Sequence, residues 1–486
     1  MALALAMALS AIGSNAFADS YPKQELRAVW FSSYVGGLTT PYNSNYGATL
    51  RNEIITYLDK CKAAGINAVY VHMRINADRM YSRNSYTFEG TTYKVDEPVS
   101  RYAAGTRGGS YPSVDLLDVW VSEAHARGIE VHAWVNPYRM IDVVGSYSKG
   151  QLPSTCNTSQ DKAVAGWLIT AKYNNGASTH ICFNPALAST KARIRNVCIV
   201  LAGNYDIDGI VFDDYFYPNG ISSDSSADDW SDYQSYRNSG GTLSIGDWRR
   251  KNVNDMVGDV NYWIHKVKPY LRFGIAPAGT VNGGQKESDG LPSLYNHSYD
   301  GVTCTPSDWV YETIFCDAMD WLREKKIDYL SPQIYWQTNN PTNAFGPMID
   351  WYSMAAKKFE RHIYAATSMT FFESANDATS WNEMKKQIEL TRATTRDNAP
   401  GVALYSSRSM FGPRAYGFDT YVKQNAYQYP ASVPAMTWYN APDLGKVTNV
   451  KLSGTTLSWT GKSNSRYIVY AVPLNTNAVQ AASSDH

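Results

Sequence analysis

Short apolar runs, rich in β-branched and aromatic residues, recur along the chain between polar, glycine or proline residues. Runs of this length and composition predict buried β-strands. Eight of them follow one another in order: Arg27–Tyr34, Ala68–Asn76, Glu130–Tyr138, Gly209–Tyr215, Arg272–Gly279, Asp328–Trp336, His362–Thr370 and Gly401–Arg408.

Segments with helical spacing of apolar residues separate these strands. Arg51–Ala64 carries an apolar face and stops at Gly65, and Val114–Arg127 stops at Gly128. Glycine directly after a helix is a common C-terminal signal. Eight strands alternating with helices predict an α/β protein, a (β/α)₈ TIM barrel with enlarged loops. A doubly wound open sheet is the rival fold, but no G-x-G-x-x-G or Walker loop follows a strand.

The most informative stretch is Asp208–Pro218, with the sequence DGIVFDDYFYP. An apolar run ends there in Asp213 and Asp214, followed by three aromatic residues. Carboxylates are costly to bury, and the C-terminal ends of barrel strands carry active sites. Paired acids beside aromatic rings are typical of enzymes that cleave glycosidic bonds. The structural alternative is that the two acids only cap the next turn.

Composition narrows the possible functions. The 44 basic and 44 acidic residues balance, which does not favour nucleic acid or an anionic membrane as partner. Aromatic residues make up 13% of the chain, which suits stacking on sugar rings. Residues 1–18 are apolar and end in Ala16-Phe17-Ala18, which predicts a signal peptide cleaved before Asp19. We therefore expect a secreted, cell-surface or periplasmic protein, and no other run is long enough to span a membrane.

Six cysteines are compatible with export. Cys304 with Cys316, and Cys156 with Cys182, are candidate disulfide pairs, whereas Cys61 and Cys198 fit buried free thiols. No C-x-x-C spacing occurs, so no structural zinc site is predicted. We expect neither a metal nor another cofactor.

The barrel pattern ends near residue 430, and residues 431–445 are expected to form a linker. Period-two alternation then marks residues 446–486, where Leu457-Ser-Trp459 and Tyr467–Tyr470 resemble the first strands of a fibronectin type III domain. Such a domain needs about 90–100 residues. The expected organisation is thus a barrel over 19–430 with a partial fibronectin-like segment.

Six motifs in order identify a family resemblance: ELRAVW (25–30), VHMRINAD (71–78), EAHARG (123–128), HAWVNPYR (132–139), DGIVFDDYFYP (208–218) and YLSPQIYW (329–336). Together they resemble the glycosyl-hydrolase-like family ten over about residues 25–430. The resemblance implies a secreted bacterial TIM-barrel glycosidase that acts on the glycan strands of peptidoglycan after removal of the stem peptides. The long polar loops 223–241 and 283–300 would shape the choice of substrate.

The resemblance also implies catalytic residues. The pattern of Asp208–Asp213 looks like the fourth strand of α-amylase-type barrels, whose last Asp faces the sugar. Because side chains alternate along a strand, Asp213 is expected to point inward as nucleophile or charge stabiliser. Asp214 then orients neighbours or binds a hydroxyl group, unless a bulge exchanges the two roles. Glu97 matches a family Glu-Pro-Trp-Ser motif, with Val99 in place of Trp, and is the expected general acid; the alternative is a surface loop acid.

The other candidates bind substrate near strand ends. Basic, amide and imidazole groups would hold a carboxylate, a hydroxyl or an N-acetyl group, and aromatic rings would stack on sugars; they are Arg74, Asn76, His132, Asn136, Tyr138, Arg139, Tyr215, Tyr217, Gln333, Tyr335 and Trp336, with Trp30 on the same rim. The expected partner is a polysaccharide or oligosaccharide.

Three other functions remain compatible with the sequence: a glycosidase for another polysaccharide, a catalytically inactive carbohydrate-binding barrel, and a barrel esterase or deacetylase. No G-x-S-x-G elbow supports an esterase.

Overall fold

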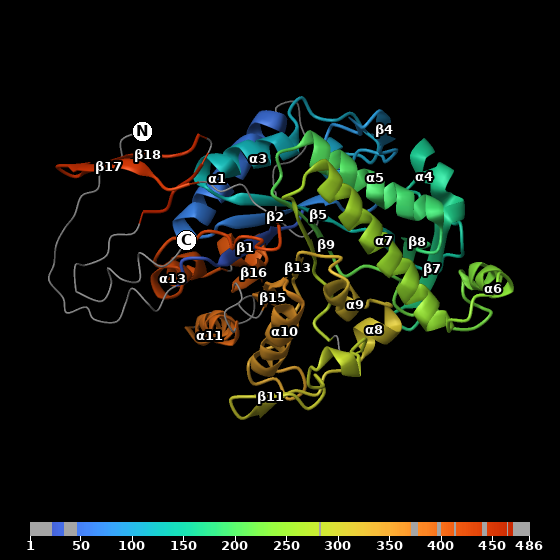
Figure 1. Ribbon diagram of the computed structural model, residues 1–486. Coiled ribbons are helices and arrows are strands. Elements are labelled where there is room, and N and C mark those ends of the chain that lie inside the picture. Colours follow the sequence, from blue (N-terminus) through green and yellow to red (C-terminus); the bar gives the residue numbers. More distant parts are fainter. Residues whose placement is uncertain are drawn as a thin grey trace.

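A parallel β-sheet that curls into a nearly closed barrel forms the centre of the protein (Figure 1). The computed structural model describes residues 22–33, 46–280, 283–370, 378–395, 400–412, 415–439, 445–463 and 465–469. In spatial order the nine strands are β14 (His362–Ile363), β13 (Tyr329–Leu330), β10 (Arg272–Ile275), β9 (Gly209–Phe212), β5 (Glu130–Val135), β2 (Ala68–Arg74), β1 (Leu26–Phe31), β16 (Gly401–Tyr405) and β15 (Ala365–Ser368).

The two edge strands of this sheet are consecutive pieces of chain. Only Tyr364 separates β14 from β15, and its backbone N–H donates to the carbonyl of Leu330 at 2.9 Å. Every pairing within the sheet is parallel. The eight predicted strands are therefore present, the seventh interrupted at Tyr364, and the predicted barrel is confirmed.

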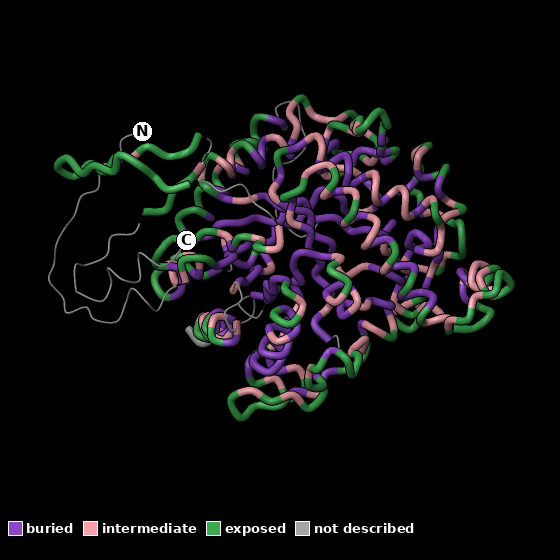
Figure 2. The backbone as a smooth tube through the Cα atoms, viewed as in Figure 1, coloured by how far each residue is buried: buried purple, intermediate pink, exposed green. Residues whose placement is uncertain are grey.

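Alternation along the strands builds two apolar layers. In β1, Ala28 and Trp30 point into the barrel, whereas Val29 and Phe31 face the surrounding helices. Figure 2 shows the resulting buried centre, with exposed residues gathered on the outer turns and loops. A shift of one position along a strand moves every side chain to the opposite face of the sheet. The register of each strand therefore decides which polar side chains reach the barrel interior.

Helices cover the outside of the barrel (Figure 1). Helices α1 and α3 end before Gly65 and Gly128, whose φ angles of 83° and 78° need a residue without Cβ. The helices are α1 (Tyr46–Ala64), α2 (Arg101–Ala104), α3 (Leu116–Arg127), α4 (Ser159–Val164), α5 (Ala188–Asn204), α6 (Trp230–Asn238), α7 (Ile245–Val267), α8 (Trp309–Thr313), α9 (Ala318–Arg323), α10 (Phe345–Phe359), α11 (Ala378–Thr394), α12 (Ser407–Phe411) and α13 (Phe418–Asn425), with short 3₁₀ turns at Ala165–Trp167 and Glu287–Asp289.

Three small antiparallel units extend the loops at the C-terminal end of the barrel. They are a hairpin of β3 (Ser85–Phe88) and β4 (Thr91–Lys94), a sheet of β6 (Arg139–Val144), β8 (Ser178–Phe183) and β7 (Leu168–Tyr173), and a hairpin of β11 (Ser298–Tyr299) and β12 (Val302–Thr303). The β6–β8–β7 sheet begins at Arg139 directly after β5, so it fixes the direction in which the chain leaves that strand.

Beyond α13 the chain returns to the N-terminal end of the barrel. The side chain of Asn67 donates to the carbonyl of Ala431 at 2.9 Å, and the indole N–H of Trp438 donates to Asp328 at 3.0 Å. Residues 431–439 of the expected linker thus contact the barrel. Strands β17 (Thr448–Ser453) and β18 (Thr456–Thr460) then pair as an exposed antiparallel hairpin. The fibronectin-like segment stays a prediction, because residues 470–486 lie outside the described part, as does the predicted signal peptide.

The cysteines differ from the sequence-based expectation. All six are buried free thiols, including Cys156, Cys182, Cys304 and Cys316. Each thiol is enclosed by the core and none forms a disulfide. The structure therefore contradicts the two candidate disulfide pairs. Among the described residues, no helix combines the length and the apolar character that crossing a membrane requires.

Candidate active site

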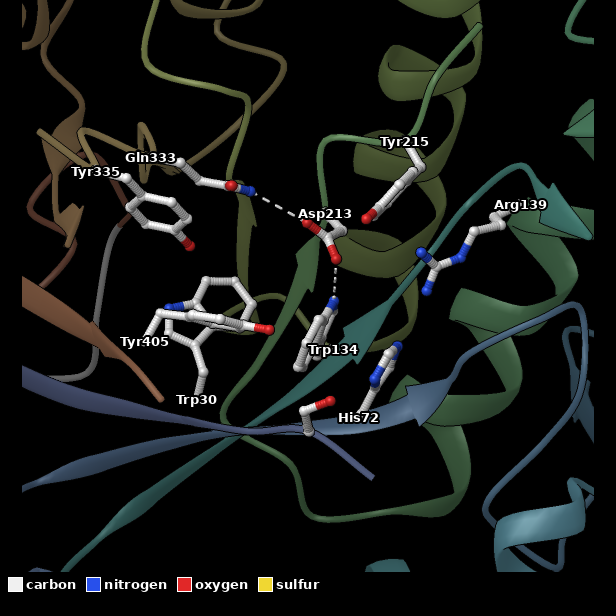
Figure 3. Close-up of a pocket in the computed structure, with 10 residues that line it drawn as sticks. Trp30, His72, Trp134, Arg139, Asp213, Tyr215, Gln333, Tyr335 and Tyr405 are labelled. Carbon is white, nitrogen blue, oxygen red and sulfur yellow. Dashed lines mark hydrogen bonds between the residues drawn. The ribbon is translucent and has the colours of Figure 1, made fainter. Parts of the chain in front are cut away.

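A cavity of about 220 Å³ opens at the C-terminal end of the barrel. Its lining comes from β1, β2, β5 and β16, from the first residue of β6, and from the chain just after β1, β9 and β13 (Figure 3). The lining residues are Trp30, Ser32, His72, Trp134, Arg139, Asp213, Tyr215, Gln333, Tyr335 and Tyr405.

Asp213 lies at the centre of this lining because of the register of β9. Val211 belongs to the barrel interior and Phe212 to the outer layer, so the next residue returns to the inside. The backbone N–H of Asp213 still donates to the carbonyl of Val135 at 3.2 Å. The strand pairing therefore extends one residue further and aims the carboxylate into the cavity, with 7% of the residue exposed.

Three donors hold the Asp213 carboxylate. The indole Nε1–H of Trp134 donates to Oδ2 at 3.0 Å, and the amide Nε2–H of Gln333 donates to Oδ1 at 3.1 Å (Figure 3). The backbone N–H of Asp214 donates to Oδ1 at 2.9 Å. Together these donors fix the position and the direction of the Asp213 carboxylate.

Asp214 is in a setting that disfavours the charged form of its carboxyl group. Burial raises the pKa of its carboxyl group well above the usual range, and the charge of Asp213 and a hydrogen bond with it raise it further. The positive charge of Arg139 only partly offsets this. Two carboxyl groups this close do not both ionise readily, so one keeps a proton while the other is charged. The protonated group can then act as an acid and the charged one as a base.

Aromatic rings form the walls of the cavity. Trp30 meets Trp134 edge to face with centroids 4.9 Å apart, and Tyr335 stacks with Tyr405 at 5.8 Å. The guanidinium group of Arg139 lies 4.1 Å from the centroid of the Tyr215 ring. Rings fixed by one another offer apolar faces without a large entropic cost on binding.

His72 stacks on Trp134 with centroids 3.7 Å apart and an interplanar angle of 6°. Burial lowers the pKa of this imidazole well below its ordinary value, and the charge of Arg139 lowers it further. His72 is therefore a neutral ring at the wall of the cavity. It adds a polar edge without adding a second positive charge beside Arg139.

Five of the predicted site residues come together in the cavity: Arg139, Asp213, Tyr215, Gln333 and Tyr335. Asp214 adjoins them through its contact with Asp213. Trp30, the expected rim residue, also lines the cavity.

Glu97 does not line the cavity. It is 3% exposed and pairs with Arg74 at 2.6 Å and with Arg193 at 2.9 Å. Burial alone would raise the pKa of Glu97, but the two guanidinium groups outweigh it and lower the pKa to about 2. A carboxyl group that stays ionised at neutral pH cannot donate a proton. The assignment of Glu97 as general acid is therefore wrong for this structure, and so is the alternative of an exposed loop acid.

Arg74 is likewise engaged elsewhere. Its guanidinium group is completely buried and donates to Glu97 and to the carbonyls of Asn136 and Pro137. Its expected role in substrate binding is corrected to a structural one, because Arg74 does not belong to the cavity lining.

Six further predicted binders also lie outside the cavity lining. His132 is buried one layer deeper in the barrel, where its Nδ1 is 2.8 Å from the hydroxyl of Tyr329. Asn136 donates to the carbonyl of Ile75 at 2.9 Å. The others are Tyr138 and Tyr217, which are buried in the outer core, Trp336, which packs against that core, and Asn76, which lies on the loop after β2.

Four lining residues were not selected from the sequence: Ser32, His72, Trp134 and Tyr405. Alternation along β5 places Trp134 on the same face as His132 and two residues nearer the barrel mouth. That spacing is the signal that could have identified Trp134. No cluster of three His, Cys, Asp or Glu residues suited to a metal ion occurs in the described part of the chain.

Comparison with known proteins gives the family. Residues 25–382 match the profile described as Glycosyl hydrolase-like 10. The chain is 28% identical over 438 residues to glycosyl hydrolase YngK of Bacillus subtilis (strain 168), covering 89% of this chain and 78% of that protein. It is 24% identical over 388 residues to glycosyl hydrolase DigH of Escherichia coli (strain K12), covering 76% of this chain and 80% of that protein.

A solved structure agrees with the barrel. The catalytic domain of β-amylase from Paenibacillus polymyxa superposes with a TM-score of 0.50 at 9% identity, over 83% of this chain and 99% of that one. Such a likeness shows the fold alone. The profile match shows that the chain belongs to the glycosyl hydrolase-like 10 family, as its six motifs predicted.

Proposed function

We propose that the protein is a secreted glycoside hydrolase that cleaves an N-acetylated glycan of the bacterial cell wall, such as peptidoglycan strands without stem peptides. The observation that carries this proposal is the Asp213 carboxylate, which Trp134 and Gln333 hold inside an aromatic cavity at the barrel mouth. A fixed negative charge among sugar-sized apolar faces suits the oxocarbenium-like transition state of glycoside hydrolysis.

The two carboxyl groups take different roles in this proposal. Asp214, whose pKa is raised, donates a proton to the leaving oxygen. Asp213 stays charged and stabilises the positive charge that develops at the anomeric carbon. Asp214 thereby replaces Glu97 as the proposed general acid, because it is next to the cavity and holds a proton.

The choice of glycan rests on the family and on the polar part of the lining. The relatives YngK and DigH are named glycosyl hydrolases, and the family resemblance implies peptidoglycan strands as substrate. His132, Asn136 and Gln333 carry the imidazole and amide groups that could recognise an N-acetyl group. Of these three, Gln333 lines the cavity, as do the polar residues Ser32 and His72. Secretion is proposed from the apolar residues 1–18 and their Ala16-Phe17-Ala18 ending.

Product analysis tests the proposal. The purified protein is incubated with peptidoglycan glycans with and without stem peptides, and with chitin, cellulose and starch oligomers. Release of fragments from the denuded glycan is expected. Release only from cellulose or starch would overturn the cell-wall substrate and keep the glycosidase. Binding without release from any polymer would favour the inactive carbohydrate-binding barrel.

A further inference from the structure

The closeness of Asp213 and Asp214 constrains the mechanism. Retaining glycosidases that use a carboxylate nucleophile place their two carboxyl groups about 5–5.5 Å apart, and inverting enzymes about 6.5–9.5 Å apart, on opposite sides of the sugar. Asp213 and Asp214 are consecutive residues in direct contact, and the backbone N–H of Asp214 donates to Oδ1 of Asp213 at 2.9 Å. A sugar ring cannot lie between two groups in such contact, so this pair cannot act as acid and opposing nucleophile.

The remainder of the cavity lining does not supply the opposing group. Apart from Asp213, the described lining residues are aromatic residues, one serine, one glutamine, one arginine and the neutral His72. None of these side chains is a carboxylate. The described part of the site therefore has a proton donor and a fixed negative charge on one side of the substrate.

We propose that the nucleophile is the carbonyl oxygen of the substrate's own 2-acetamido group, with Asp213 orienting that group and Asp214 acting as acid and then base. This inference rests on the proposed function and names the chemical feature that a substrate must have, a 2-acetamido sugar on the non-leaving side of the cleaved bond.

The hydrogen bonds of Asp213 fit such a role. A carboxylate offers about four lone-pair sites, and Trp134, Gln333 and the backbone N–H of Asp214 occupy three of them. The fourth can accept the proton of the neighbouring Asp214 carboxyl group. When Asp214 turns its proton to the glycosidic oxygen, the N–H of the acetamido group donates to Asp213 in its place.

The reaction then proceeds in two steps. The acetamido carbonyl oxygen forms a bond to C1 while the bond from C1 to the leaving oxygen breaks, and that oxygen takes the proton of Asp214. The product is a cyclic oxazolinium ion, whose N–H⁺ is stabilised by the charge of Asp213. Water then attacks C1, Asp214 takes a proton from it, and the ring opens to restore the acetamide. The configuration at C1 is retained.

Re-acylated glycan strands test the nucleophile. Denuded peptidoglycan strands are de-N-acetylated, and separate portions are re-acylated with acetyl or with difluoroacetyl groups. Fluorine withdraws electrons from the carbonyl oxygen, so kcat on the difluoroacetyl strands is expected to fall by about tenfold or more. The re-acetylated strands are the matched control and should be cut like the starting material. The difluoroacetyl strands should still compete with them for the site.

The outcomes separate this inference from the proposed function. Equal kcat on both kinds of strand, or inversion at C1 measured by NMR, would overturn the acetamido nucleophile and keep the glycosidase. Failure of the difluoroacetyl strands to compete would reduce the acetyl group to a recognition element, which also overturns it. No cleavage of native or re-acetylated strands would overturn both proposals.

Discussion

The indole N–H of Trp134 donates to Oδ2 of Asp213 at 3.0 Å, from one barrel strand to the end of its neighbour. Trp134 is 4% exposed and is packed between His72 and Trp30. The ring is therefore fixed before substrate arrives, and with it the direction of the carboxylate. Preorganised donors of this kind act without a reorganisation cost during the reaction.

Replacing Trp134 by Phe removes this donor and keeps an aromatic ring against His72. A hydrogen bond to a charged group contributes about 1.5–3 kcal/mol, so we expect kcat to fall by about 10–100-fold. KM should change little, because the ring face remains. Trp309→Phe, at a tryptophan with 37% of its surface exposed, is the control and should retain wild-type kinetics. Unchanged kcat in Trp134→Phe would show that the Asp213 orientation is set by other contacts.

Asp213→Asn removes the charge while keeping the shape. We expect turnover to fall by about 10³-fold or more, by analogy with the removal of other catalytic groups, with the fold intact by circular dichroism. Asp255→Asn is the control, because Asp255 pairs with Lys251 at 2.7 Å on the surface of α7. Wild-type rates in a folded Asp213→Asn protein would remove this residue from the mechanism.

The barrel and the inward direction of Asp213 follow from local patterns in the sequence. Strand length, flanking glycines and alternation depend on neighbouring residues, and they direct Asp213 into the barrel. How deep a side chain lies within the barrel does not depend on its neighbours in the sequence. His132 and Trp134 share one face, yet the side chains of a barrel stack in layers. Only the pairing with β9 and the contact with Tyr329 put His132 in the deeper layer.

Long-range ion pairs explain the error at Glu97. Arg193 lies 96 residues further along the chain, on α5, and no periodicity relates the two positions. Alternation also ends where β5 and β9 end, so the sequence did not show that Tyr138 and Tyr217 turn into the outer core. The sequence therefore indicated the site better within strands than in the segments that follow them.

Glu97→Gln should destabilise the fold rather than change the chemistry. Breaking a buried ion pair costs about 3–5 kcal/mol, because the partner charges stay buried. Denaturant unfolding at neutral pH measures this loss. Asp118→Asn, which breaks the exposed pair with Arg83, is the control and should cost about 0–1 kcal/mol. A folded variant with wild-type stability and a lost alkaline limb in its pH–rate profile would restore Glu97 as the acid.

The pH dependence of stability follows from the same ion pair. The pKa of Glu97 is about 2 in the folded protein and about 4.3 in an unfolded chain. A depressed pKa stabilises the fold above the unfolded value, and this contribution is lost as the pH falls through the folded value. The stability difference between wild type and Glu97→Gln should therefore shrink between about pH 5 and pH 2. A constant difference over that window would contradict the assignment.

Treatment with a thiol reductant should leave the thermal stability of the protein unchanged. All six cysteines are free, and burial raises the pKa of the Cys156 and Cys304 thiols to about 11. Because the thiolate is the form that reacts in disulfide exchange, these buried thiols resist oxidation. Thiol titration under denaturing, non-reducing conditions should count six groups, and dithiothreitol should not shift Tm. A count of four or two would reveal the disulfides that the structure lacks.

The alkaline limb of the pH–rate profile should belong to Asp214. Burial and the charge of Asp213 raise the pKa of its carboxyl group, so the proton needed by the leaving oxygen is kept to a higher pH than in an ordinary aspartic acid. It is lost as the pH rises through this pKa, and kcat falls with it.

Asp214→Asn cannot donate that proton, so the alkaline limb should flatten. Aryl glycosides with good leaving groups need little protonation and should retain more activity than substrates with poor ones. The comparison variant is Asp213→Asn, which should damage both kinds of substrate similarly, because it removes charge stabilisation rather than the acid. Equal losses on good and poor leaving groups in Asp214→Asn would move the general acid to another residue and leave the charge of Asp213 as the remaining function of the pair.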